Sequence, residues 1–429
     1  MRIPQNGTLS MKKKTILVLS DHPFSPSGVG TQTKYVIEAL LKTDRYRVVC
    51  FGGAIKHADY SPRQVEGWGE DWVIHPVKGY GTPDLVRSVF RSERPDVVWF
   101  MTDPRFWEWL WQMDNEIRAL APMVYYHVWD NYPFPMFNKT FYDSNDLVVA
   151  ISKVTHDIVQ NVSPDVESKY LPHAVNSEIF KPIPDEEVAR FTDDFFKDGK
   201  DKTIFFWNNR NARRKQSGTL IVWFKEFLDI VGHDQACLLM HTDARDPHGQ
   251  DLPAIIERFG LLENKQVQLS EEKLDAKVLS FIYNMADCTI NISDAEGFGL
   301  ATLESLSCGT PIIVNMTGGL QEQVTDGNEW FGVGIEPTAK AVIGSLNVPY
   351  IYEDRISKED FINALIKIHN MSKSERKELG SMGRQHVLKN YNFDDFCNNW
   401  VETIDEVCEK HGSWETRKGY NRWKLMEIK

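Results

Sequence analysis

Short apolar runs alternate along the chain with segments whose apolar residues recur at helical spacing. In the first part of the chain these runs cover residues 14–20, 46–51, 71–77, 96–101, 123–128 and 146–152. Amphipathic segments such as 31–42 and 84–93 separate them. Runs that are apolar throughout, rather than at alternate positions, are typical of a parallel sheet covered by helices on both faces. The pattern therefore predicts a doubly wound α/β domain.

A second series of the same kind follows. Its strand-like runs cover residues 202–208, 236–242, 266–270, 287–293 and 311–315, and helical patterns lie between them. The interval 180–202 is acidic, contains prolines and has no strand-like run, which indicates a linker. We therefore predict Rossmann-like domains at residues 11–185 and 200–385. Two such domains facing each other predict a cleft beyond the carboxyl ends of their strands.

Composition narrows the class of protein. With 42% hydrophobic and 26% charged residues the chain is typical of soluble globular proteins. No apolar run approaches the ~18 residues that a membrane span needs, and the run after Lys14 is too short for a secretory signal. We expect a cytoplasmic protein with at most peripheral membrane contact. The net charge of −12 argues against duplex nucleic acid as a partner, and six cysteines without a CxxC pair indicate reduced structural thiols.

The stretch SDAEGFGLATLESLS, residues 293–307, carries the most suggestive chemistry. Gly297 and Gly299 allow a ligand to approach the backbone, and the first N–H groups of the helix that follows form an anion site. A carboxylate before the helix, Glu296, suits sugar hydroxyls, and one within it, Glu304, suits a ribose diol. The simpler alternatives are a solvated loop acid at Glu296 and an acid at Glu304 that complements the helix dipole.

A nicotinamide-binding Rossmann unit is a rival interpretation of the first domain, because Gly28 and Gly30 follow its first strand. The third glycine of the GxGxxG pattern is replaced by Thr33, and the second strand ends without the acid that would hold a ribose. These departures disfavour a dinucleotide site.

Several stretches together resemble the family-four retaining glycosyltransferases. EGFGLATLE, followed by CGTPIIV and GGLQEQV, is similar to the E-x7-E signature of that family. SPSGVGTQTKYVIEAL, YYHVWD, LPHAVNSEIFKP and NNRNARRKQSG resemble its glycine loop, its strand that ends in histidine, its interdomain segment and its Arg/Lys loop, in the same order. The resemblance implies the GT-B fold: two doubly wound domains around a central cleft, with C-terminal helices at 386–429 that return to the N-terminal domain.

The resemblance also implies roles for single residues on the donor side. Arg210 and Lys215 would neutralise the departing nucleotide diphosphate, Glu296 would hold hydroxyls of the transferred sugar, and Glu304 would take the ribose. The remaining donor-binding candidates are Gly28, Gly30, Arg213, Phe298, Gly299 and Leu300. The sequence departs from the family where Asn209 replaces a glycine and where Gln216 follows Lys215 in place of the commoner glycine.

The N-terminal domain supplies the acceptor side in this family. His127 would touch the transferred sugar or the acceptor, although a histidine at a strand end is also a common structural residue. Trp129 and Asp130 are candidates for the acceptor side, because sugar rings stack on aromatic faces and a carboxylate orients a hydroxyl.

The implied reaction moves a hexose from a UDP- or GDP-type sugar to a hydroxyl acceptor: a glycan, a lipid-linked acceptor or a small molecule. We expect retention by same-face displacement, with Arg210 and Lys215 in place of a metal ion and without a cofactor. The alternatives are a GT-B epimerase or phosphorylase, a DNA-base glucosyltransferase, and an inactive binding module.

Overall fold

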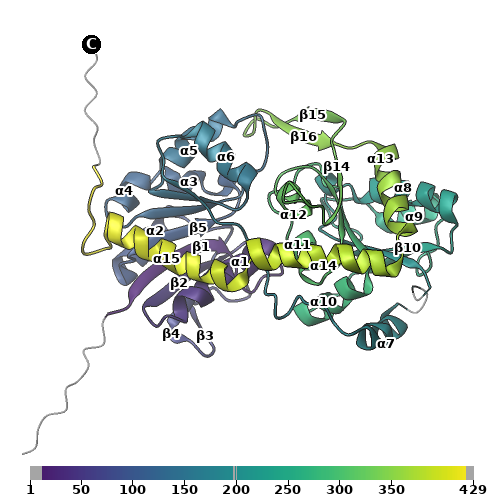
Figure 1. The fold of residues 1–429 in the computed structure, drawn as a ribbon. Helices are drawn as coiled ribbons and strands as arrows, with labels where there is room; N and C mark the ends of the chain where they lie inside the picture. The colour runs from purple at the N-terminus through teal and green to yellow at the C-terminus, as the bar shows by residue number, and fades with distance from the viewer. Residues whose placement is uncertain (1–11, 197–198, 200, 422–429) are drawn as a thin grey trace, which may run out of the picture.

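The computed structural model describes residues 12–196, 199 and 201–421. They form two α/β domains that stand side by side, with a long C-terminal helical segment running along both (Figure 1). Residue 11, where the first domain was predicted to begin, and the last eight residues of the predicted segment 386–429 lie outside the described residues. The two α/β domains and the C-terminal helices agree with the predicted GT-B architecture.

The N-terminal domain is built on an eight-stranded sheet of order β3-β4-β2-β1-β5-β6-β7-β8, parallel except for β3. Its strands are β1 Lys14–Asp21, β2 Tyr46–Gly53, β3 Arg63–Val65, β4 Gly69–Pro76, β5 Val97–Met101, β6 Met123–His127, β7 Leu147–Ala150 and β8 Ser168–Tyr170. Its helices are α1 Gly28–Leu41, α2 Pro83–Glu93, α3 Glu108–Trp111, α4 Asp114–Arg118, α5 Lys139–Asp143 and α6 Lys153–Val162. Successive side chains of β1 point to opposite faces of the sheet. Ile16 and Val18 are buried in the hydrophobic core on one face, and Leu17 and Leu19 are buried in the core on the other face. Burial on both faces explains why the strand is apolar throughout.

The C-terminal domain has a six-stranded parallel sheet of order β11-β10-β9-β12-β13-β14. Its strands are β9 Thr203–Asn208, β10 Ala236–His241, β11 Val267–Ser270, β12 Cys288–Asn291, β13 Ile312–Asn315 and β14 Gly332–Ile335. Helix α7 Asp185–Phe195 precedes the sheet; α8 Ser217–Val231, α9 Leu252–Arg258, α10 Ala276–Met285, α11 Leu300–Ser307, α12 Leu320–Val324 and α13 Lys358–Asn370 belong to it. The strand order reverses between β9 and β12, as it does between β1 and β5 in the first sheet, and such switch points are where α/β sheets bind ligands.

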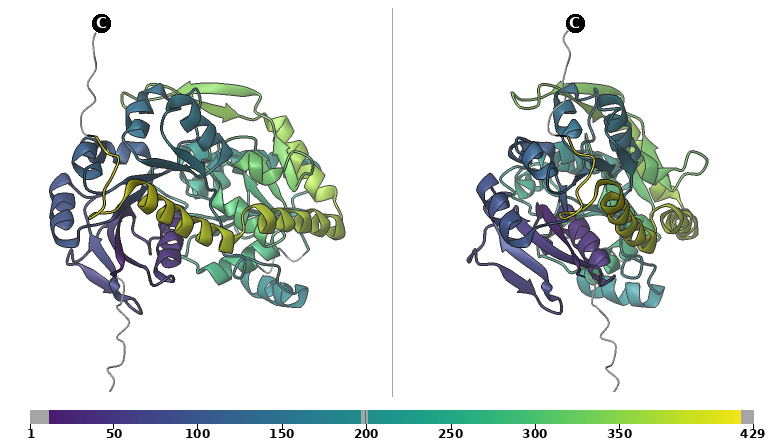
Figure 2. Two further views of the ribbon diagram at one scale, coloured as in Figure 1. Left: turned by 60° about the vertical axis from the view of Figure 1, so that its left-hand side comes forward. Right: turned by 90° about the vertical axis from the view of Figure 1, so that its left-hand side faces the viewer.

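Two C-terminal helices join the domains, as the resemblance implied. Helix α14 Lys373–Asn390 packs on α11, and α15 Phe393–His411 packs on α1 of the other domain. The views in Figures 1 and 2 show these helices as one yellow-green segment along both domains. Trp400 of α15 is fully buried between Trp99 and Tyr126 of the N-terminal sheet. A buried tryptophan of this size contributes a large share of the apolar contact that fixes the helix there.

A β-hairpin of the C-terminal domain is an element that the sequence patterns did not predict. Strands β15 Ala339–Ile343 and β16 Ile351–Arg355 pair antiparallel, apart from both large sheets. The hairpin reaches the N-terminal domain, where the Tyr352 amide donates to the Tyr132 carbonyl at 2.6 Å and Asn131 Nδ2 donates to the Tyr352 carbonyl at 3.0 Å. It therefore bridges the two domains on one side. Within the part of the chain that the structure describes, no helix is long and apolar enough to cross a membrane.

Candidate active site

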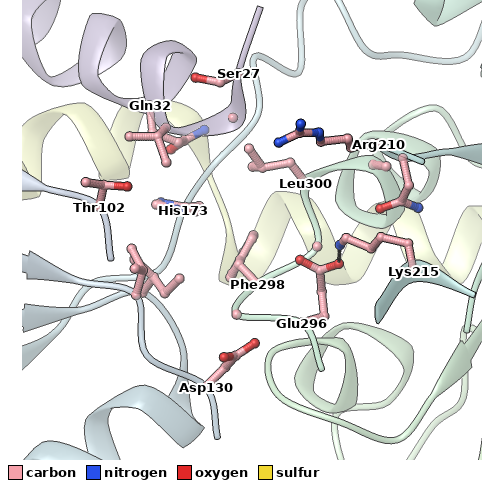
Figure 3. Close-up of a pocket in the computed structure, with 18 of the residues that line it drawn as sticks. Ser27, Gln32, Thr102, Asp130, His173, Arg210, Lys215, Glu296, Phe298 and Leu300 are labelled. Atoms are coloured by element: carbon pink, nitrogen blue, oxygen red, sulfur yellow. Dashed lines mark hydrogen bonds and ion pairs between the residues drawn. The ribbon is translucent and has the colours of Figure 1, made fainter. Parts of the chain in front are cut away.

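A cavity of about 1000 Å³ lies between the two domains, at the carboxyl ends of β1, β5, β6, β9 and β12. Figure 3 shows Ser27, Gln32, Thr102 and His173 on its N-terminal side, with Lys215 and Glu296 opposite. The structure brings most of the predicted site residues into this cavity: Gly28, Trp129, Asp130, Arg210, Arg213, Lys215, Glu296, Phe298, Gly299, Leu300 and Glu304. Gly30 and His127 do not line it.

Glu296 stands in the loop between β12 and α11, and glycines give this loop its shape. Gly299, with φ 91°, is the N-cap of α11. Gly318 packs beneath the loop with φ 49°, and a Cβ there would lie 1.9 Å from the Glu296 carbonyl oxygen. Only glycine fits such a backbone contact. Gly299, Leu300 and Ala301 at the start of α11 line the cavity, and a Cβ added to Gly28 across it would lie 2.8 Å from Leu300 Cδ1. The first amides of a helix have no partner within it.

The Glu296 carboxylate forms an ion pair with the Lys215 ammonium inside the cavity (Figure 3). Burial by itself would raise the pKa of Glu296, but Lys215 and Arg214 outweigh it and hold this pKa below its usual value. Burial, with help from Arg214, lowers the pKa of Lys215 to about 8. Both partners are therefore charged at neutral pH, which gives the cavity a cation that a phosphate oxygen can approach.

Glu304 projects from α11 into the same cavity. Its Oε2 accepts a hydrogen bond of 2.7 Å from the hydroxyl of Tyr283, and burial raises its pKa to about 7. Its second oxygen makes no hydrogen bond with the described residues. A carboxylate in this state has accepting capacity left for ligand hydroxyls, which suits a diol.

The loop after β9 supplies the positive charge. Arg210 is 60% exposed and donates to Asp246 at 2.6 and 3.1 Å, and Arg213 donates to the buried Glu353 of β16 at 2.9 and 2.5 Å. Arg214 donates to the Ala295 carbonyl, which joins this loop to that of Glu296. All three guanidinium groups belong to residues that line the cavity.

Gln216 explains one departure from the family pattern. It adopts a left-handed conformation, φ 58°, at the position where glycine is common and α8 begins. Its side chain compensates for the unfavourable backbone by donating to Asp294 at 2.5 Å and accepting from Thr219 at 2.7 Å. These two hydrogen bonds hold Gln216 in the left-handed conformation without a glycine.

The structure corrects two of the predicted site residues. His127 is completely buried, and its Nε2 forms a 2.7 Å hydrogen bond with the hydroxyl of Tyr142 on α5, beneath the sheet. Side chains alternate between the faces of a strand, so the next residue, Val128, lines the cavity instead. Gly30 lies within α1, and its amide donates to the N-cap oxygen of Ser27 at 3.0 Å. This amide is therefore not available to a ligand.

Both acceptor-side candidates line the cavity, and Asp130 lies at its lower end in Figure 3. Burial raises the pKa of Asp130 to about 6. Trp129 is mostly buried, and its indole N–H donates to the Asn131 carbonyl at 3.0 Å. Asp130 and the edge of Trp129 therefore belong to the same wall of the cavity.

Among the cavity residues that the sequence analysis missed are Gln32 on α1, His173 after β8, and Glu353 on the hairpin. His173 stood in the LPHAVN stretch but without a role, and only its burial beside Tyr126 shows where it points. Within the described residues there is no group of three or more His, Cys, Asp or Glu side chains arranged to hold a metal ion.

Comparisons with known proteins find a family match over part of this chain. Residues 247–385 match the family described as glycosyl transferases group 1. The chain is 27% identical over 215 residues to an alpha-1,3/1,6-mannosyltransferase ALG2 of Dictyostelium discoideum, which covers 46% of this chain and 44% of that protein. It is 37% identical over 84 residues to a D-inositol 3-phosphate glycosyltransferase 2 of Catenulispora acidiphila, 19% of this chain and 20% of that one. The matched segments thus span less than half of the relatives' own lengths.

Solved structures resemble the whole chain in fold. A sucrose-phosphate synthase from Thermosynechococcus elongatus has a TM-score of 0.73 at 17% identity, over 92% of this chain and 100% of that one. The structure of Anabaena Alr3699/HepE in complex with UDP and glucose has a TM-score of 0.67 at 14% identity, over 92% and 100%. At these identities the likeness establishes the two-domain fold.

Proposed function

Residues 247–385 belong to the group 1 glycosyltransferases, and from this premise we propose that the whole chain transfers a hexose from a nucleotide-diphosphate sugar to a hydroxyl acceptor, with retention of the anomeric configuration. The observation that carries the proposal is the convergence of Lys215, Glu296 and Glu304 on one interdomain cavity with the opening of α11. A diphosphate, a sugar and a ribose each find a suitable partner there.

The donor fits the C-terminal side of the cavity in this proposal. The diphosphate meets Arg210, Lys215 and the first amides of α11, because cations and a helix N-terminus both favour negative charge. The ribose hydroxyls donate to Glu304. The hexose lies against Glu296 and the Phe298–Leu300 backbone. The HepE complex holds UDP and glucose, which makes UDP-glucose the first donor to try.

The transfer step is a same-face displacement. The bond between the anomeric carbon and the leaving phosphate oxygen breaks while the acceptor oxygen forms a bond on the same face, and the acceptor proton passes to that phosphate oxygen. Arg210 and Lys215 stabilise the negative charge that develops on the diphosphate, which is the role of preorganised cations in transition-state stabilisation. Asp130 accepts a hydrogen bond from the acceptor hydroxyl and orients it. No metal ion enters this scheme.

A ligand screen tests the proposal. A ligand that binds only the native state raises the unfolding temperature, so UDP, GDP, UDP-glucose and GDP-mannose are each added in a thermal-shift assay. We expect one nucleotide and its sugar to stabilise the protein, and slow release of free sugar and nucleoside diphosphate in the absence of an acceptor. Formation of an epimerised sugar nucleotide would favour the epimerase alternative. Absence of stabilisation by all four ligands would contradict the proposal.

A further inference from the structure

Gln32 of α1 is completely buried and has an unused hydrogen-bond acceptor at the cavity. Its Nε2 donates to the Ala174 carbonyl at 2.8 Å. A carbonyl can only accept, so this bond fixes which end of the amide is nitrogen. The other end, Oε1, has no hydrogen-bond partner among the described residues. Gln32 lines the cavity, so this buried acceptor without a partner lies in the cavity wall.

His173, next to Ala174, has a second unused acceptor. Its Nδ1 lies 2.8 Å from the hydroxyl oxygen of Tyr126, and that hydroxyl donates its one proton to the Leu171 carbonyl at 2.9 Å. Nδ1 must therefore carry the hydrogen, because only this arrangement satisfies all three buried groups. Burial lowers the pKa of His173 to about 3, so the ring is neutral. Nε2 then has a lone pair and no hydrogen.

The two side chains share a place in the cleft. Ala174, the residue after His173, accepts the bond from Gln32, and the His173 ring packs edge-on against Phe298 at a centroid distance of 5.1 Å. Figure 3 shows Gln32 and His173 on the N-terminal side and Phe298 between them and Glu296. They thus face the loop of Glu296 from the opposite domain.

The chemistry of this pair selects the ligand. Two lone-pair acceptors without a positive charge require a ligand that donates hydrogen bonds, and they repel phosphate oxygens, which only accept. Buried acceptors without a partner destabilise a protein, so a ligand that supplies donors relieves that penalty. A sugar ring, with hydroxyls on neighbouring carbons, supplies two such donors.

We propose that Gln32 Oε1 and His173 Nε2 form a subsite of the N-terminal domain that accepts hydrogen bonds from hydroxyl groups of the transferred sugar. This inference rests on the proposed function and deepens it: the C-terminal domain holds the nucleotide diphosphate and, through Glu296, one side of the sugar, and the N-terminal domain binds further hydroxyl groups of that sugar. Binding of the sugar then requires both domains to contact the same donor molecule at once.

The test compares two affinities for each variant: that for the nucleoside diphosphate and that for its sugar nucleotide. Calorimetry uses UDP with UDP-glucose and GDP with GDP-mannose. His173→Asn keeps a polar atom near Nδ1 for Tyr126 and has none at Nε2, whereas His173→Gln carries an amide oxygen to about the Nε2 position. Gln32→Met fills a similar volume without an acceptor. We expect His173→Asn and Gln32→Met to lower the affinity for the sugar nucleotide roughly three- to tenfold relative to that for the diphosphate, and His173→Gln to lower it less.

His127→Asn is the matched control, because His127 is also a buried histidine bonded to a tyrosine hydroxyl but lies outside the cavity. It should leave the ratio of the two affinities unchanged. Thermal unfolding confirms that each variant is folded, and Gln32→Met keeps the test open if a histidine variant does not fold. Unchanged ratios in both His173→Asn and Gln32→Met, or equal losses for diphosphate and sugar nucleotide, would overturn the subsite. Wild-type protein that binds none of the four ligands would instead overturn the proposed function, and the subsite with it.

Discussion

The two walls of the cleft differ in charge and in how their polar groups are used. Among the described residues that line the cavity, the C-terminal wall has five basic side chains: Arg210, Arg213, Arg214, Lys215 and Lys273. The N-terminal wall has one, Arg105. Arg105 pairs with Asp103 at 2.7 Å, just as Arg210, Arg213 and Lys215 of the C-terminal wall each pair with an acid, so the walls differ in the number of basic groups. The N-terminal wall offers neutral acceptors at Gln32 and His173 instead. The contrast teaches that one donor molecule can be shared between two domains: the C-terminal wall has the cations for its diphosphate, and both walls have acceptors for its hydroxyl groups.

The largest effect is expected at the cation that the C-terminal wall buries. Lys215→Met removes a positive charge that stabilises the leaving diphosphate, so release of nucleoside diphosphate from the donor should slow by about 100- to 1000-fold. The change also leaves Glu296 as an unpaired buried charge and should lower the free energy of unfolding by about 3–5 kcal/mol. The double variant Lys215→Met/Glu296→Gln, compared with Glu296→Gln alone, separates the two effects: it should recover stability but turn the donor over far more slowly than Glu296→Gln. Turnover equal to that of Glu296→Gln would show that Lys215 has only a structural role.

The two glutamates of the C-terminal wall should affect different quantities. At a pH above about 7, where Glu304 is ionised, Glu304→Gln should raise the Kd for the nucleoside diphosphate roughly 10- to 100-fold, because a hydrogen bond to a charged group is lost. Glu296→Gln should leave that Kd within about threefold and lower kcat, since its sugar partner is present only on the intact donor. Calorimetry with the diphosphate, beside turnover of the sugar nucleotide, measures both. Equal loss of diphosphate binding in the two variants would contradict the assignment of Glu304 to the nucleotide and Glu296 to the sugar.

Glu304 should also make stability depend on pH. Burial raises its pKa from 4.5 to about 7, so the folded protein favours the protonated acid. Its contribution to stability is complete below pH 4.5 and is lost as pH rises to about 7, because only the unfolded state ionises freely in this window. Relative to Glu304→Gln, the wild-type free energy of unfolding should fall by roughly 1–3 kcal/mol between pH 4.5 and 7.5. Denaturant unfolding of both proteins at several pH values measures the difference, and parallel curves would contradict the buried, protonated state.

The smallest effect is expected from chelation. Because Arg210 and Lys215 supply the positive charge at the diphosphate, donor turnover in EDTA should equal that in untreated buffer within error. The matched measurement adds Mg²⁺ or Mn²⁺ back after chelation. Activity that disappears in EDTA and returns only with a divalent ion would show that a metal ion, and not Arg210 and Lys215, neutralises the diphosphate.

Much of the fold could be predicted because its strands are buried on both faces. Strand β9, five of whose six residues are buried, is apolar at every position from Ile204 to Trp207, with no polar residue at alternate positions. The hairpin could not be predicted, because β15 is mostly exposed and its bridge depends on Asn131 and Tyr132 of the other domain. Hydrogen bonds between the hairpin and residues 131–132 produce no hydrophobic periodicity in the sequence of the hairpin or of those two residues.

The same reasoning separates the site residues that were predicted from those that were not. Glu296, Glu304, Arg210 and Lys215 stand in two short stretches whose spacing is itself recognisable. The choice between His127 and His173 depends on which face of the sheet each side chain takes, and on which tyrosine it meets. A single buried histidine looks the same in sequence whether it faces Tyr142 or an open cavity.

The configuration of the released sugar tests the central claim most directly. UDP-glucose and GDP-mannose both carry an α-linked hexose, and the wild-type protein is incubated with whichever of them stabilises it, with water as the acceptor. Proton NMR follows the first free sugar before its anomers equilibrate. The account predicts that the α-anomer appears first, together with the nucleoside diphosphate. Initial release of the β-anomer, or no turnover of a sugar nucleotide that binds, would contradict it.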